Sequence, residues 1–364
     1  MKTNRLVCAL LTLVLLCVSF AGCTPAAPAA EATPAPAAEA TAAPEAPAAP
    51  EATQAPAAGT YKVAMLLTGV INDAGWNQSA YEGLQLAEKD LGAQIAYTES
   101  VLQPDFESVL RDYASQGYNL IIAVGNEFSD AALVVAPDFP DVKFAVMNGN
   151  SFQEPNVAAY RFNTPQTGFL AGVCAALYSK TGVVGMIGGT TLPHIVDAVD
   201  SFAAGAKYIN PNIKVLTGFT ESMTDVAKGK EMAMTYIEQG ADVLSANANS
   251  CGLGVIEAAK EKGIMHIGYI SDQNGVAPDT IMVSAVQSNQ LLIKAMVQAG
   301  MDGSMKASLN LFGMTEGAIY LSDFHGHDSA LPEGGKAKID EVVAGILDGS
   351  LKEQGILPKS TFEK

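Results

Sequence analysis

The chain has 364 residues and a formal net charge of −17 at pH 7. Outside the first few residues it contains no block of basic side chains, so we do not expect it to bind nucleic acid. The part that follows residue 59 is long enough for two domains of ordinary size.

Residues 1–22 have the pattern of a secretory signal peptide. Lys2 and Arg5 precede an apolar run, and small residues stand immediately before Cys23. The run is about 15 residues long, shorter than the roughly 20 that a membrane-spanning helix needs, which favours cleavage over a retained anchor. We therefore predict that Cys23 is lipidated and anchors the mature chain to the cell membrane on its outer side. A cleaved signal without a lipid is the alternative.

Residues 23–59 consist almost entirely of Ala, Pro, Glu and Thr after the cysteine. Such a composition cannot bury a core, and repeated proline favours the extended polyproline II conformation. We expect a disordered tether that holds the rest of the chain away from the membrane.

From residue 60 onward, short apolar runs alternate with helical segments. The first series contains YKVAMLL, QIAYTES, NLIIAVG and KFAVMNG, and a second series begins at PQTGFLAGVCAALYSK and contains GVVGMIGG, KVLTGFT, DVLSANA and IMHIGYI. Strand runs that are apolar on both faces, separated by helices, predict parallel sheets with crossover helices. The chain is thus predicted to be an α/β protein with two similar halves.

The last part of the chain is too short for a third domain, so we expect it to complete both sheets. This gives an N-terminal lobe of residues 60–163 plus about 279–310, and a C-terminal lobe of residues 164–278 plus about 311–364. Hinges are expected near residues 163–165 and 274–278. Cys174 and Cys251 lie in expected helices and are predicted to be buried free thiols, not a disulfide.

Ligands of open parallel sheets bind outside the carboxyl ends of the strands, so two such sheets that face each other make a cleft. The loops at these ends are rich in Asn, Thr, Ser, Asp and Gly, which offer hydrogen bonds without large charge. Trp76, the one tryptophan, lies on the first of these loops. We expect its ring to form a wall of the cleft; the alternative is an aromatic residue that packs the loop against the next helix.

Several motifs occur in the order typical of one family. They are NDAGWNQSAYEGL, GFLAGVCAAL, GVVGMIGG, TDVAKGKEMAMTYIEQGADV, GLGVIEAAKEKG and GYISDQN. Over nearly everything after the tether, the chain resembles the basic membrane protein family, also called PnrA-like, whose members are substrate-binding lipoproteins of ABC importers. The resemblance implies a type I periplasmic-binding-protein-like fold, with two doubly wound parallel-sheet lobes around a ligand cleft. It also implies a purine-type ligand that is delivered to an ABC transporter permease.

The resemblance also suggests site residues. The aromatic residue that stacks on the purine, and the Asn after it, fall on Trp76 and Asn77, and a second aromatic wall falls on Phe219. Stacking on a planar ligand contributes about 1–3 kcal/mol for each ring. Amides both donate and accept hydrogen bonds, so they are expected to read the edge of the ring. These amides are Asn77, Asn126, Asn148 and Asn249.

The charged positions of the nucleoside binders differ in this chain. They are occupied by Leu67 with Thr68 beside it, by Asn148, by Ile270 and by Gln287. Only Asp272 keeps its charge, and we expect it either to accept an N–H from the ligand or to form a turn. The replaced Asp and Lys are the groups expected to hold ribose hydroxyls, and an unsatisfied buried hydroxyl costs about 1–3 kcal/mol. The substitutions therefore favour a nucleobase or small heterocycle over a ribonucleoside.

An enzyme is the main alternative from another class. A nucleoside hydrolase needs a carboxylate cluster or a metal, and a phosphorylase needs a basic anion site; neither pattern is found, so we predict no catalytic activity and no cofactor. The segment DFHGHD holds Asp323, His325, His327 and Asp328. Without further ligands at defined spacing, it is expected to be a solvated loop and not a zinc site.

Other receptors with the same kind of cleft stay open as alternatives. A sensory lipoprotein would bind the same ligand but pass the signal to a different partner. Sugar receptors usually hold the hydroxyls of the sugar ring with pairs of Arg and Asp. A sugar receptor is therefore disfavoured, because Arg111 and Arg161 are the only arginines after the signal. We expect a monomer, since such a receptor closes around its ligand by a hinge motion.

Overall fold

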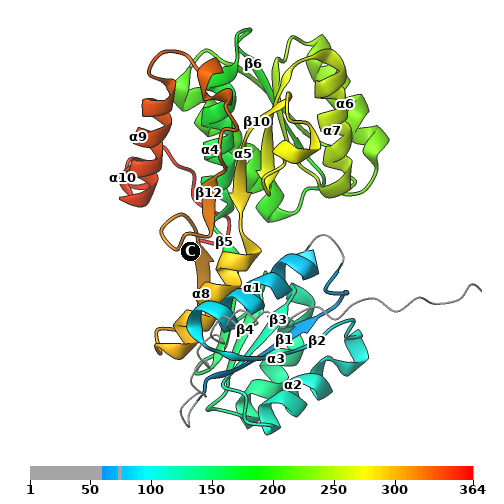
Figure 1. Cartoon of the computed structure of the whole chain (residues 1–364), viewed down its shortest axis with the longest axis vertical. Helices are drawn as coiled ribbons and strands as arrows, with labels where there is room; N and C mark the ends of the chain where they lie inside the picture. The colour runs from blue at the N-terminus through cyan, green and yellow to red at the C-terminus, as the bar shows by residue number, and fades with distance from the viewer. Residues whose placement is uncertain (1–59, 73–75, 364) are drawn as a thin grey trace, which may run out of the picture. The chain divides into compact units, whose positions relative to one another are not determined.

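The structure is a computed structural model that describes residues 60–72 and 76–363 (Figure 1). The predicted signal peptide, Cys23 and the tether lie outside the described residues. Among the residues that are described, no helix is both long enough and apolar enough to cross a membrane.

The first sheet has six strands in the order β11-β5-β4-β3-β1-β2, and all neighbouring strands are parallel. The strands are β1 (Lys62–Leu67), β2 (Gln94–Thr98), β3 (Leu120–Val124), β4 (Lys143–Met147), β5 (Val157–Phe162) and β11 (Leu309–Phe312). The helices of this half are α1 (Trp76–Leu91), α2 (Phe106–Ser115), α3 (Ser129–Val135) and α8 (Asn289–Met301), with short 3-10 turns η1 (Gln103–Asp105), η2 (Asn126–Phe128) and η3 (Ala136–Asp138).

Strand β1 shows how the sequence builds this sheet. Its residues alternate between the two faces, as successive strand residues do. Val63 and Met65 pack in one buried cluster with residues of α1 and α8, whereas Ala64 and Leu66 pack in another with residues of α2 and α3. Both faces are therefore covered by helices, which explains why the strand is apolar throughout.

The second sheet also has six strands, in the order β12-β10-β9-β8-β6-β7, and only β12 is antiparallel to its neighbour. The strands are β6 (Val183–Gly188), β7 (Lys214–Phe219), β8 (Val243–Asn247), β9 (Met265–Ile270), β10 (Ile281–Gln287) and β12 (Ile319–Leu321). The helices are α4 (Thr164–Tyr178), α5 (Pro193–Ile209), α6 (Val226–Glu238), α7 (Asn249–Lys262), α9 (Gly335–Leu347) and α10 (Ser350–Glu353), with η4 (Asn274–Val276) and η5 (His327–Ala330).

Helices α4 and α5 cover one face of the second sheet and pack very closely against each other. Glycines make this approach possible, because a Cβ atom added at Gly172 would lie 2.0 Å from the carbonyl oxygen of Phe202. On the other face, α6 starts at a side-chain cap in which Asp225 accepts the N–H groups of Ala227 and Lys228 at 3.1 and 3.2 Å.

Within the described residues the chain passes between the two sheets three times, after β5, after β10 and after β11. Asn163 separates β5 from α4. We expected the chain to return to the first sheet near residue 279, which is too early. Strand β10 pairs with β9 in the second sheet, and the chain crosses only after Gln287. Residues 274–278 join two strands of the same sheet, so they are not a crossing. The apolar run of β10 would fit in either sheet, so the sequence pattern does not show to which sheet this strand belongs.

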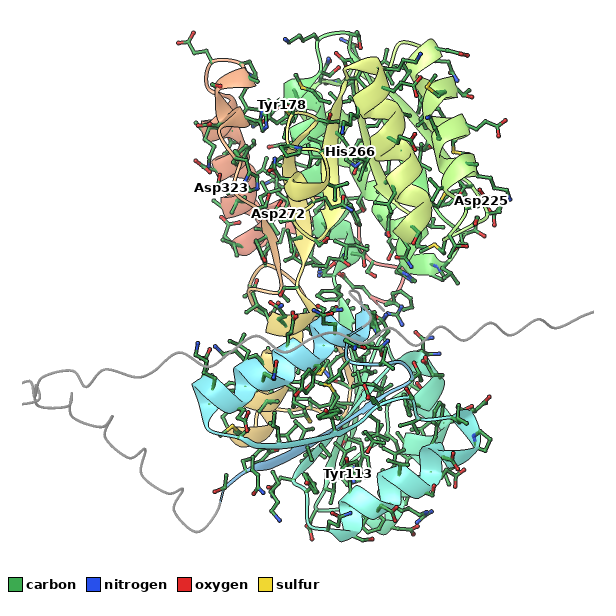
Figure 2. The ribbon with its side chains drawn as sticks, turned by 45° about the vertical axis from the view of Figure 1, so that its right-hand side comes forward. Tyr113, Tyr178, Asp225, His266, Asp272 and Asp323 are labelled. Atoms are coloured by element: carbon green, nitrogen blue, oxygen red, sulfur yellow. The ribbon has the colours of Figure 1, made fainter. Side chains whose placement is uncertain are left out.

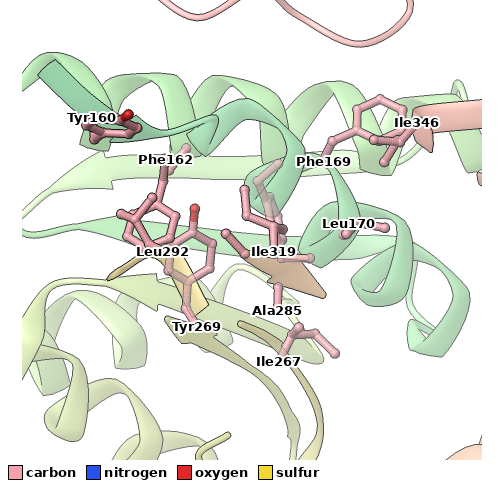
Figure 3. Packing of buried hydrophobic residues seen from close by; sticks show 14 of the residues in the cluster. Tyr160, Phe162, Phe169, Leu170, Ile267, Tyr269, Ala285, Leu292, Ile319 and Ile346 are labelled. Carbon is pink, nitrogen blue, oxygen red and sulfur yellow. The ribbon is translucent and has the colours of Figure 1, made fainter. Parts of the chain in front are cut away.

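Buried side chains of both sheets meet beside these crossings. Phe162, Tyr269, Leu292 and Ile319 belong to one hydrophobic cluster, and Figure 3 shows how they approach one another. The two mostly parallel sheets with flanking helices confirm the predicted α/β class. Cys174 and Cys251 are both free and buried, as expected, and burial raises the pKa of the Cys174 thiol to about 12.

Candidate ligand-binding cleft

A cavity of about 910 Å³ lies where the carboxyl ends of strands from both sheets come together. Its volume falls in the range of roughly 300–1,000 Å³ that is typical of small-molecule sites. The first half contributes the start of α1 and the ends of β4 and β5, and the second half contributes the starts of α4, α5 and α7 and the ends of β8, β9 and β10. The cavity therefore occupies the place that the predicted topology gives to a ligand cleft.

The predicted residues that line this cavity are Trp76, Asn148, Asn249 and Gln287. Trp76 is the first residue of α1, one step beyond the loop in which the sequence placed it. Gln287, at the end of β10, donates a hydrogen bond from Nε2 to Thr167 Oγ1 at 2.9 Å. The structure thus brings one large aromatic ring and three amides to a single cavity.

The polar residues predicted on the first half, apart from Asn148, lie outside this lining. Thr68 Oγ1 donates to Glu127 at 3.3 Å. Asn126 accepts the backbone N–H of Asn150 at 3.1 Å through Oδ1, so it holds the loop that follows β4. Asn77 packs its side chain against Gly69. These side chains contact the loops around the cavity and are not among the residues that line it.

Two residues predicted on the second half are also placed elsewhere. Phe219 ends the edge strand β7, and its ring covers Gly188 instead of forming a second wall of the cavity. Asp272 Oδ2 lies 2.9 Å from Nε2 of His325. His325 belongs to the same segment as Asp323, which Figure 2 labels near Asp272. The structure therefore gives both residues contacts within the protein.

The DFHGHD segment is held to the loop between β9 and β10. His325 contacts Asp272 in this loop, and His327 Nε2 donates to the carbonyl of Pro278 at 2.8 Å. Within residues 60–72 and 76–363, no group of three or more His, Cys, Asp or Glu side chains is arranged to hold a metal ion.

Arg161 is a site residue that the sequence reasoning missed. It is only 6% exposed and lines the cavity at the end of β5. Its Nη1 donates to the carbonyl oxygen of Asn148 at 2.7 Å and to the side-chain oxygen of Asn150. An arginine within the apolar run VAAYRF was the available signal, because a buried guanidinium needs specific acceptors.

The end of the chain reaches this arginine. The centroid of the Phe362 ring lies 3.9 Å from the guanidinium carbon of Arg161. The preceding residues are held by Asp197 of α5, whose Oδ2 accepts from Ser360 Oγ at 2.8 Å and from Thr361 N at 3.0 Å. Burial lowers the pKa of Arg161, and the charge of Asp197 acts in the opposite direction.

The backbone is strained at three places in the cavity wall. Asn148, Asn249 and Ile270 have φ angles of 57°, 43° and 73°, and each lines the cavity at or just beyond the end of a strand. Non-glycine residues rarely adopt positive φ, and a β-branched residue does so least of all. Strain of this kind concentrates at functional sites, where the surrounding structure enforces it.

Comparison with known protein families identifies one match. The family described as "ABC transporter substrate-binding protein PnrA-like" matches residues 60–341.

Named relatives cover most of the chain. "Transcriptional activator protein med" of Bacillus subtilis is 29% identical over 72% of this chain and 82% of its own length. "Basic membrane protein A2" of Borrelia garinii is 34% identical over 63% of this chain and 69% of its own length. "Purine-binding protein BAB2_0673" of Brucella abortus is 29% identical over 80% of this chain and 82% of its own length.

Solved structures show the same fold. A transcriptional activator of the comK gene from Bacillus halodurans superposes with a TM-score of 0.70 at 25% identity, covering 79% of this chain and 97% of the other. A solute-binding protein of an ABC transporter system from Aeropyrum pernix superposes with a TM-score of 0.62 at 23% identity, covering 79% and 92%.

Proposed function

The chain belongs to the PnrA-like family of ABC transporter substrate-binding proteins, and on this premise we propose that its cleft binds a purine-type ligand for delivery to a membrane permease. The family and the solute-binding relatives are binding proteins and not enzymes. The observation that carries the proposal is the position of Trp76 in the same cavity as Asn148, Asn249 and Gln287. One aromatic face and several amides suit a planar heterocycle with polar edges.

A nucleobase or small heterocycle suits the cleft better than a ribonucleoside. Gln287 occupies the position of the Lys that nucleoside binders are expected to use for the ribose, and its Nε2 already donates to Thr167. Ile270 replaces an Asp and lines the cavity with an apolar side chain. The relative named as a purine-binding protein supports the ligand class.

We further propose how the protein works in its setting. The sheets with their helices act as two lobes that close on the ligand about the crossings after β5, β10 and β11. The protein acts as a monomer. Lipidated Cys23 anchors it to the outer side of the cell membrane, and the tether of residues 23–59 joins this anchor to the lobes. Two of the similar proteins are named as transcriptional activators. Their names favour sensing of the same ligand as the second candidate role.

Fluorescence tests the ligand class, because Trp76 is the only tryptophan in the chain. The secreted form with Cys23→Ser, stripped of carried-over ligand, is titrated with adenine, hypoxanthine, xanthine, guanine and their nucleosides. We expect a saturable change with a base and a far weaker one with its nucleoside. Calorimetry of Trp76→Phe is the control: binding persists while the signal disappears.

Each other outcome has a defined meaning. Tight nucleoside binding refutes the argument from Ile270 and Gln287 while the purine class stands. A lack of response and of heat with every purine refutes the purine proposal. Loss of labelled-base uptake after deletion of the gene supports transport. Unchanged uptake together with altered base-dependent transcription supports sensing.

A further inference from the structure

The cavity extends from the cleft beneath the first turns of α7. We call this part the side chamber; it is lined by Ala246, Gly252, Leu253, Ile256, His266 and Ile270. His266 pairs with Leu244 on the neighbouring strand, and Leu244 packs with α7 residues such as Val255. His266 and Ile270 therefore share the face of β9 that is turned toward α7. At about 3.3 Å per residue, His266 lies roughly 13 Å along the strand from Ile270.

His266 is the polar group of the side chamber, deep inside the second half (Figure 2). The residue is 1% exposed, and neither ring nitrogen has a hydrogen-bond partner among the described residues. Buried polar groups in proteins nearly always have a partner. Burial lowers the pKa of this imidazole to about 3, so the ring is neutral at physiological pH and offers one donor and one acceptor.

The remainder of the side chamber is apolar. Leu253 is 45% exposed and Ile270 36% exposed, so both residues keep accessible apolar surface. Gly252 leaves ordinary space, since a Cβ atom there would meet the Cβ atom of Ala246 at 3.6 Å. None of the six lining side chains is charged at neutral pH, so an ionic group would be buried there without compensation.

We propose that the side chamber is a specificity subsite for an uncharged, hydrogen-bonding substituent, such as a hydroxyl or amide, carried on a short apolar chain. This inference rests on the proposed function, because the substituent extends from the ring that lies against Trp76. A neutral imidazole can accept the proton of a hydroxyl through its unprotonated nitrogen, or donate its N–H to a hydroxyl or carbonyl oxygen. The two nitrogens point in different directions, so one substituent group uses one of them. The preferred ligand is then a substituted heterocycle, and a bare base fills only the main part of the cavity.

Matched purine probes test this subsite in the secreted form with Cys23→Ser. Adenine is compared with purines that carry a 6-hydroxyhexyl or a heptyl chain, which have equal length. The chain is attached to the exocyclic 6-amino nitrogen in one pair and to ring nitrogen 9 in the other. We expect the hydroxyl member of one pair to bind about tenfold more tightly than its alkyl partner and than adenine.

Two histidine variants separate the subsite from general effects. In His266→Leu, the ratio of hydroxyhexyl to heptyl affinity falls to about one. His327→Leu makes the same change outside the cavity lining and keeps the ratio of the unmodified protein. Should His266→Leu fail to fold, nitrogen NMR of the unmodified protein provides the readout, as the chain has only four histidines. The ring resonances of His266 then shift with the hydroxyhexyl ligand and stay unchanged with the heptyl ligand.

The results distinguish this inference from the proposed function. Equal affinities for both members of both pairs, with adenine still bound, overturn the subsite and leave the purine proposal intact. A preference that survives in His266→Leu also overturns it, as does an unshifted His266 resonance. Failure of every purine to bind overturns both.

Discussion

Arg161 gives the sharpest test of how the cleft is held together. The change Arg161→Met keeps an unbranched side chain of similar length but removes the guanidinium. The carbonyl oxygen of Asn148 then loses its donor at 2.7 Å, and the side chain of Asn150 loses another. The contact between the guanidinium and Phe362, at 3.9 Å, is lost as well.

Two opposing effects decide the magnitude. Hydrogen bonds to a charged group contribute about 1.5–3 kcal/mol each, and a cation–π contact contributes about 0.5–2 kcal/mol. Removal of a buried charge recovers desolvation free energy, which can make an apolar replacement neutral. Here the carbonyl oxygen of Asn148 belongs to a strained turn and stays half-buried without a donor, whereas the side chain of the exposed Asn150 can turn to water. We therefore expect the loss to dominate, at about 2–4 kcal/mol.

Urea denaturation of the ligand-free protein measures this loss. Arg161→Lys serves as the matched control, since it keeps the charge but cannot donate to several acceptors in a fixed fork; we expect it to recover less than half of the difference. A free energy of unfolding for Arg161→Met within about 0.5 kcal/mol of the unmodified value would refute the assigned role, because that is the range of an ordinary surface substitution.

Three further predictions concern the ligand, the packing and pH. Trp76→Ala should weaken base binding by about 1–3 kcal/mol, roughly 5- to 160-fold, in calorimetry; an unchanged affinity contradicts stacking. Gly172→Ala should destabilise the protein by about 3 kcal/mol in urea, at the upper end of overpacking costs, because its Cβ atom would lie 2.0 Å from a backbone oxygen. Gly252→Ala, with a 3.6 Å contact, should change stability by less than about 1 kcal/mol. Burial lowers the pKa of His266 from 6.5 to about 3, so between these values the imidazole binds a proton in the unfolded chain but not in the folded one. The contribution of His266 to stability is therefore complete above pH 6.5 and falls as pH decreases. The free energy of unfolding should drop by about 2 kcal/mol between pH 7 and pH 5 through this group, a loss that is absent in His266→Leu; the lowered pKa of His194 adds a loss of the same sign in both proteins.

Much of the fold follows from local patterns in the sequence. The run DVLSANA, for example, becomes β8, and all five residues of this strand are buried. Strands that are apolar on both faces leave few alternatives to a parallel sheet covered by helices. Assignment of a strand to one of two similar sheets is different, because it depends on pairing across the fold. That is why β10 was expected in the wrong half.

The cleft was predicted in outline but not in all its residues. Trp76 and Asn148 follow from their places near strand ends, where ligands of such folds bind. Phe219 stands at a strand end too, yet its ring covers Gly188, and Asn126 is used to hold the loop at Asn150. Whether a polar or aromatic side chain serves a ligand or its own loop depends on the three-dimensional neighbours. Arg161 and His266 were missed for a related reason. Each is a polar residue within an apolar strand run, and the sequence alone does not show whether such a residue faces a cavity or the core.

The charges of the cleft argue for a neutral ligand. Glu82 lines the cavity, but its two carboxylate oxygens accept hydrogen bonds from Gln78 at 2.9 Å and from Gln290 at 2.6 Å. The Nη1 group of Arg161 is directed at the turn that begins with Asn148. Both charges are therefore engaged by the protein's own groups, whereas Trp76 and Asn249 line the same cavity without charge. An ion would have to compete for partners that are already in use, but an uncharged ring needs only stacking and amide hydrogen bonds.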